Sequence, residues 1–118
     1  MIASLLVFCA ALAGAASTAP ANELSAILEI RAINTAEVNY YTGHDRYATK
    51  LEDLGDEVKP VHNGYRFTLA GTASGYTIHA DPLKYPDTGR RSFFSDETTV
   101  IRQNKGDGPA TAASPEVE

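Results

Sequence analysis

The chain has 118 residues, which is enough for one globular domain and too few for two. Its formal net charge is −5, and the only adjacent basic pair is Arg90-Arg91, so the sequence excludes a surface built to follow a nucleic-acid backbone. Cys9 is the only cysteine, which excludes a disulfide framework and a zinc site made of several thiolates.

The first segment is an uncharged, apolar run over residues 2–16, IASLLVFCAALAGAA, followed by small residues. This pattern is typical of a secretory signal peptide, and both Ala13-Gly14-Ala15 and Ala19-Pro20-Ala21 suit a cleavage site. A membrane-spanning helix needs ~20 apolar residues, so the run is short for that role. We therefore expect residues 1–21 to be a signal peptide or a short anchor, and the protein to be periplasmic, on the cell surface or secreted.

A helix is predicted over residues 22–41, with Asn22 as its N-cap and Glu23 in its first turn. Its apolar side recurs at helical spacing but is interrupted by one polar residue, Asn34. The residues on that side are Ile27, Ile30, Asn34, Val38 and Tyr41. Gly43 is expected to end the helix. The loop that follows contains KLEDLG at 50–55, which predicts one short helical turn whose Leu51 and Leu54 point inward.

Alternation of apolar and polar residues predicts two strands after the Asn63-Gly64 turn, at 65–70 and 76–81, joined by a hairpin loop. A proline-rich loop over 82–91 leads to two more short strands, at 92–95 and 99–103. The predicted fold class is α+β, with an N-terminal helix packed on an antiparallel sheet of three or four strands over residues 22–104. Residues 105–118 contain almost no large apolar side chains and are predicted to be a disordered tail.

The order and spacing of these segments resemble the head domain of type IV pilins and type II secretion pseudopilins over residues 26–104. The segments that carry this resemblance are SAILEIRAINTAEVNYY, YATKLEDLG, NGYRFTLAG, SGYTIHADP and TGRRSFFSDETTVIR. The N-terminus departs from the family, because the usual prepilin leader with its Gly-Phe pair and the long apolar helix after it are missing. The resemblance implies a non-catalytic, exported structural protein that docks on other pilin or pseudopilin subunits.

Nothing in the sequence predicts catalysis. His44, His62 and His79 have no metal-ligand spacing, no G-x-S-x-G element is present, and Gly71 and Gly75 lie in a hairpin instead of before a helix. An acidic loop from Asp45 to Glu57 could hold calcium, but a solvated loop is the expected state. We therefore expect no catalytic residues, no cofactor and no metal. The tyrosines are expected to pack in the core, with a partner-binding or glycan-binding surface as the alternative.

The sheet is expected to cover only the C-terminal half of the helix, near Val38 and Tyr41. The candidate interaction site is then the uncovered N-terminal half, with Leu24, Ile27, Leu28 and Ile30, packed on a helix of a partner. Two alternatives remain open. One is a free exported binding module, adhesin-like, that uses the 82–91 loop and its Arg90-Arg91 pair. The other, which ranks last, is a small hydrolase or metal-dependent enzyme.

Overall fold

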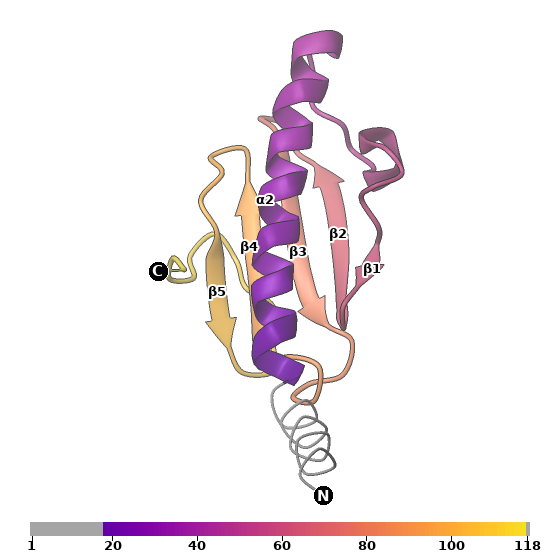
Figure 1. The fold of residues 1–118 in the computed structure, drawn as a ribbon. Coiled ribbons are helices and arrows are strands. Elements are labelled where there is room, and N and C mark those ends of the chain that lie inside the picture. The colour runs from indigo at the N-terminus through magenta and orange to yellow at the C-terminus, as the bar shows by residue number, and fades with distance from the viewer. Residues whose placement is uncertain (1–17, 118) are drawn as a thin grey trace, which may run out of the picture.

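The computed structural model describes residues 18–117, which form one helix packed on one face of a single antiparallel sheet (Figure 1). The sheet order is β1-β2-β3-β4-β5, so every strand pairs with its neighbour in sequence. The elements in chain order are helix α2 (Thr18–His44), the short 3₁₀ helix η1 (Leu51–Leu54), and strands β1 (Val61–His62), β2 (Tyr65–Gly71), β3 (Tyr76–Pro82), β4 (Arg91–Asp96) and β5 (Arg102–Lys105). The predicted α+β class is confirmed.

The predicted number of strands is wrong, because the sheet has five strands and not three or four. The additional strand is β1, which pairs with β2 through Val61 opposite Arg66 and His62 opposite Tyr65. Asn63 and Gly64 form the turn, both with positive φ (46° and 80°), as a two-residue hairpin requires. A two-residue strand is too short to show an alternating pattern, so only the turn was visible in the sequence.

Helix α2 is longer than predicted at both ends, starting at Thr18 and ending at His44. Pro20 lies inside the helix, two residues before the predicted N-cap. The predicted N-cap, Asn22, lies inside the helix instead, and its side-chain amide donates to the carbonyl of Thr88 at 3.0 Å. Gly43 does not end the helix.

The core lies between α2 and the sheet. The helix contributes Ala26, Ile27, Ile30 and Ile33, and the sheet contributes Tyr65, Phe67, Tyr76, Ile78, Ala80 and Phe93. The predicted alternation of β2 and β3 is confirmed, since Tyr65 and Phe67 are buried while Arg66 and Thr68 are exposed. Leu51 and Leu54 of η1 pack against this core, as predicted.

The sheet covers the N-terminal part of α2, and the C-terminal end of the helix extends beyond the sheet (Figure 1). The prediction that the sheet covers only the C-terminal half is therefore wrong. Val38 and Tyr41, expected to be covered, are 51% and 44% exposed. The helix is longer than the strands, since 27 helical residues extend for about 40 Å and strands of six or seven residues for roughly 23 Å. The contacts of Glu23 with Arg90 and Arg91 hold the N-terminal end on the sheet, so the C-terminal end is the part left uncovered.

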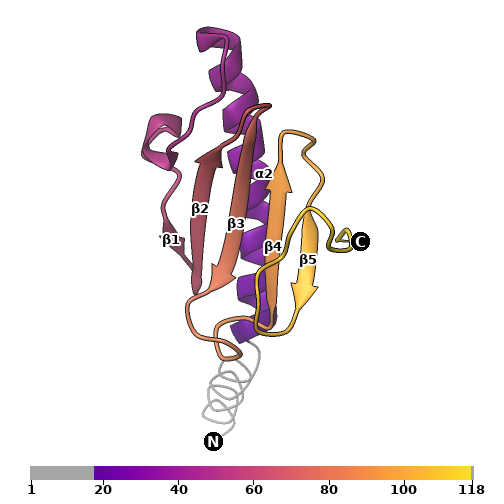
Figure 2. The ribbon, with the colours of Figure 1, turned by 180° about the vertical axis from the view of Figure 1, so that it is seen from behind.

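The segment after β5 is ordered, although the sequence predicts a disordered tail over 105–118. It crosses the face of the sheet opposite α2 and returns to the outer edge of β5 (Figure 2). Ala110 is fully buried, and the backbone N–H of Gln103 donates to the carbonyl of Pro115 at 2.8 Å. The sequence did not predict this arrangement. It depends on the burial of one small residue and on backbone hydrogen bonds at a strand edge, and neither feature requires a recognisable pattern of residue types.

Candidate interaction surface on helix α2

Three polar side chains lie on the sheet-facing side of α2, and two of them, Glu23 and Asn34, determine how the helix is rotated about its axis. The first is Glu23, whose side chain is only 11% exposed. One carboxylate oxygen accepts from the backbone N–H of Arg90 at 2.8 Å, and the other pairs with Nε of Arg91 at 2.9 Å. Arg91 also donates to the side-chain oxygen of Gln103 at 2.7 Å. The start of the helix is therefore held against β4 and β5 by a charge-assisted network.

The second is Asn34, the residue that interrupts the apolar pattern. The hydroxyl of Tyr76 donates to its Oδ1 at 2.6 Å, and its Nδ2 donates to the hydroxyl of Ser95 at 3.0 Å. Ser95 in turn donates to the carbonyl of Val100 at 2.9 Å. A buried amide with both ends bonded has one acceptable orientation, so this chain fixes the helix over β3 and β4.

The third is Glu37, which is fully buried. Its Oε1 accepts from the backbone N–H of Ala48 at 2.7 Å, whereas its Oε2 is buried without a hydrogen-bond partner. Burial raises the pKa of this carboxyl to about 7; the bond from Ala48 opposes the shift, and the nearby carboxylate of Asp53 adds to it. Glu37 ties the loop after α2 back to the helix.

The orientation of α2 places the four residues of the predicted interaction site on two different sides of the helix. Leu24 and Leu28 are 59% and 58% exposed and lie on the side of α2 turned away from the sheet. Ile27 and Ile30 are 8% and 0% exposed and belong to the core, so their expected exposure is wrong. The signal that could have separated the two pairs is the position of Glu23, Asn34 and Glu37, which share the face of the buried isoleucines.

The exposed leucines belong to a stripe that follows the alternating four- and three-residue steps of a helix–helix seam. We call it the outer seam, and its members are Leu24, Leu28, Arg31, Thr35 and Val38, all of them exposed. Beside its second half lies a hollow of about 440 Å³, lined by Arg31, Asn34, Thr35, Val38 and Thr99. Apolar residues at three of five seam positions, next to a concavity, suit the knobs of a partner helix.

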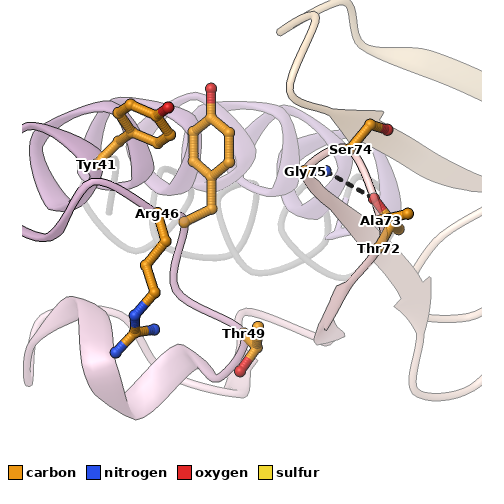
Figure 3. Close-up of a pocket in the computed structure, with 8 residues that line it drawn as sticks. Tyr41, Arg46, Thr49, Thr72, Ala73, Ser74 and Gly75 are labelled. Atoms are coloured by element: carbon orange, nitrogen blue, oxygen red, sulfur yellow. Dashed lines mark hydrogen bonds between the residues drawn. The ribbon is translucent and has the colours of Figure 1, made fainter.

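A second concave region lies where the end of α2 meets the turn between β2 and β3 (Figure 3). This pocket of about 520 Å³ is lined by Tyr41, Arg46, Tyr47, Thr49 and the turn Thr72–Gly75. The rings of Tyr41 and Tyr47 lie 4.8 Å apart, and Tyr47 meets Tyr76 edge-on. Arg46 extends away from the Tyr41 ring (Figure 3) and lies over Tyr40 instead. The tyrosines thus divide: Tyr65 and Tyr76 are buried in the core, whereas Tyr41 is partly exposed.

The other candidate groups are dispersed. His44 bonds the carbonyl of Tyr40, His62 contacts Asn63, and His79 packs edge-on against Phe94. Within residues 18–117, no three His, Cys, Asp or Glu side chains converge as metal ligands would. The Arg90-Arg91 pair does not present two free cations, because Arg91 is engaged by Glu23. In this same part of the chain, no helix is long and apolar enough to cross a bilayer.

The proposed export segment falls mostly outside the described residues. Positions 1–17 are not described, and positions 18–21 form the first turn of α2.

Comparisons with protein-family models, with curated proteins and with solved structures find no match to this chain.

Proposed function

We propose that this protein is a non-catalytic structural subunit, an exported pilin-like head that docks on other pilin or pseudopilin subunits of a type IV pilus or type II secretion-type system. The observation that carries the proposal is the outer seam. Leu24 and Leu28 are more than half exposed on a helix whose other side is held by two polar anchors, Glu23 and Asn34. Neighbouring exposed leucines on a helix face are typical of a protein–protein contact.

The arrangement of helix and sheet supports the proposal in a second way. One long N-terminal helix lying across an antiparallel meander agrees with the architecture that the sequence resemblance implies. Because the anchors prevent the helix from rotating to bury its leucines, this apolar surface is available to another chain. A partner helix with its own apolar stripe suits the spacing of the outer seam.

The test is a pair of charge substitutions, Leu24→Glu and Leu28→Glu, in the native host. Both side chains lie outside the core, so we expect the melting temperature to remain within a few degrees of the unmodified chain. Cross-linking from position 35, an outer-seam position that the double variant leaves unchanged, should capture a pilin-like subunit when both leucines are present and lose it in the double variant. The matched control is Thr68→Glu, which adds a charge on the exposed strand face of the sheet.

Two outcomes contradict the proposal. Persistence of the complex in the folded double variant would remove the outer seam from the contact. An intact mass that matches cleavage near Ala15 or Ala21, for a protein that purifies alone from the envelope as a monomer, favours a free exported binding module.

A further inference from the structure

The outer edge of β5 holds a strand that the chain itself supplies. The N–H of Gln103 donates to the carbonyl of Pro115 at 2.8 Å, and the N–H of Val117 donates to the carbonyl of Ile101 at 2.9 Å. Arg102 lies directly opposite Glu116 in antiparallel register. The edge is thus able to accept an antiparallel strand, and residues 115–117, which we call the edge strand, show the register.

The side chains of β5 and of the edge strand are complementary in charge. Strand β5 carries Arg102 and Lys105, and the edge strand carries Glu116 opposite Arg102. A guanidinium nitrogen of Arg102 also donates to the carbonyl of Ser114 at 2.9 Å. Val117 packs against the core cluster as a partly buried apolar side chain. Opposite charges across a strand pair are favourable, whereas a second copy of β5 would place cations near cations. The edge therefore suits a short acidic strand that ends in an apolar residue.

The linker allows the edge strand to leave without disturbing the sheet. None of the paired positions of strands β1 to β5 lies beyond Lys105. Gly106 turns the chain with a φ of +116°, and the hydrogen bond from Asn104 to Gly108 holds the turn. Pro109 follows, and proline favours extended backbone in the residue before it, here Gly108. Ala110 is the only buried residue between Pro109 and Val117.

We propose that the edge of β5 is a strand-exchange site, at which the edge strand of a second copy replaces the resident one. The replacement reforms the same backbone hydrogen bonds and the same Arg102–Glu116 pairing, so the closed monomer and the exchanged dimer differ mainly in the linker. Exchange of an identical element is a low-cost route to association. This contact uses β5 and the chain after it, and it is independent of the outer seam that carries the proposed function.

The experiment uses two full-length variants. One is altered at the β5 edge that receives a strand, and the other is altered in the edge strand that is exchanged. Gln103→Pro removes the N–H that faces away from β4, a position at which an edge strand tolerates proline. Its edge strand remains intact, but its own β5 edge keeps only the hydrogen bond from Val117 to Ile101. Val117→Pro removes the donor to Ile101, so its β5 edge is intact but its own edge strand keeps only the hydrogen bond from Gln103 to Pro115. Gln103→Ala and Val117→Ala are the controls, because they remove the same side chains and keep both N–H groups.

Each proline variant alone should sediment as a monomer, and an equimolar mixture should form a one-to-one dimer, identified by native mass spectrometry with one variant isotopically labelled. The mixture of alanine controls should form less dimer than the mixture of proline variants, because in each control the resident edge strand keeps both hydrogen bonds and competes for the site. Adding Glu116→Lys to the Gln103→Pro variant should weaken the dimer roughly two- to fivefold.

Two results overturn the proposal. One is a mixture of folded proline variants that stays monomeric. The other is self-association of Val117→Pro as strong as that of the mixture, which would mean that the edge pairs with another edge. If Gln103→Pro does not fold, the peptide of residues 111–118, TAASPEVE, replaces it as donor. Failure of Val117→Pro to bind that peptide in preference to a scrambled peptide is then the contradicting result.

Discussion

Glu37 places a carboxylate in the core where, among the described residues, no cation pairs with it. The groups that face it are Asp53 from η1, the backbone of Ala48, and the phenol of Tyr76, whose own pKa is raised, chiefly by burial and then by the charge of Glu37. Two lone pairs of Oε2 therefore have no donor once the group ionises. A neutral carboxyl is the better-tolerated form in this position.

The stability of the protein should consequently depend on pH near neutrality. The pKa of Glu37 is about 7 in the folded chain and 4.5 in the reference state, so folding favours the protonated form. The associated stabilisation is complete below pH 4.5 and is lost as the pH rises through 7. We expect Glu37→Gln to raise the unfolding free energy at pH 8 by on the order of 2 kcal/mol relative to the unmodified chain, with little effect at pH 4.5.

Urea denaturation between pH 4.5 and pH 8 measures this difference. Glu29→Gln is the matched control, since it makes the same chemical change on a half-buried part of the same helix. Parallel pH profiles for Glu37→Gln and the unmodified chain would show that Glu37 does not ionise in the way its surroundings indicate.

At the scale of elements, α2 is oriented by polar contacts more specifically than by its apolar residues. Ala26, Ile27, Ile30 and Ile33 span a broad arc, and apolar packing alone tolerates some rotation of the helix. The hydrogen bonds at Glu23 and Asn34 do not tolerate such a rotation, because a buried polar group that loses its partner costs about 1–3 kcal/mol. These contacts leave Leu24 and Leu28 facing outward.

The pairing of Glu23 with Arg91 should therefore contribute to stability. We expect Glu23→Ala to lower the unfolding free energy by ~1–3 kcal/mol, because Arg91 and the N–H of Arg90 lose their partner at a site of low exposure. A double-mutant cycle with Arg91→Ala, followed by urea denaturation, should give a coupling above ~0.5 kcal/mol. The control is Lys84→Ala, which removes an ion pair whose side chains are 77% and 64% exposed and should change little. Equal effects at the two sites would contradict the anchoring role.

At the scale of the whole molecule, the chain after β5 crosses the β4 part of the sheet face that α2 leaves open (Figure 2). Phe94 is 5% exposed although its side chain lies on the face opposite the helix, in register with His79. Ala110 is fully buried, and it is the buried residue of the returning segment before this segment reaches β5.

A charge at this residue should release the segment while the sheet persists. We expect Ala110→Asp to increase the hydrogen-exchange rates of the Gln103 and Val117 amides at least roughly tenfold, since both hydrogen bonds depend on the returning segment. The amides of β3 should keep their protection, because their partners lie in β2 and β4. Ala112→Asp is the control at an exposed position. Unchanged exchange at Gln103 would show that the edge strand is held independently of Ala110.

The sequence by itself determined the α+β class, the helix, the turn at η1 and the alternation in β2 and β3, because each depends on local chemistry or on a periodic pattern. Asn34 was visible as an interruption, but its partners Tyr76 and Ser95 are 42 and 61 residues away, and no local pattern reports them. Only the tertiary structure decided which side of α2 is covered, since that depends on buried polar pairing. The same reason separates Leu24 and Leu28 from Ile27 and Ile30. The tertiary structure also decided how much of the helix is covered, since that depends on the relative lengths of helix and strands. The ordered path of residues 106–117 was likewise decided by an unfilled strand edge and an uncovered sheet face, which exist only after the chain has folded.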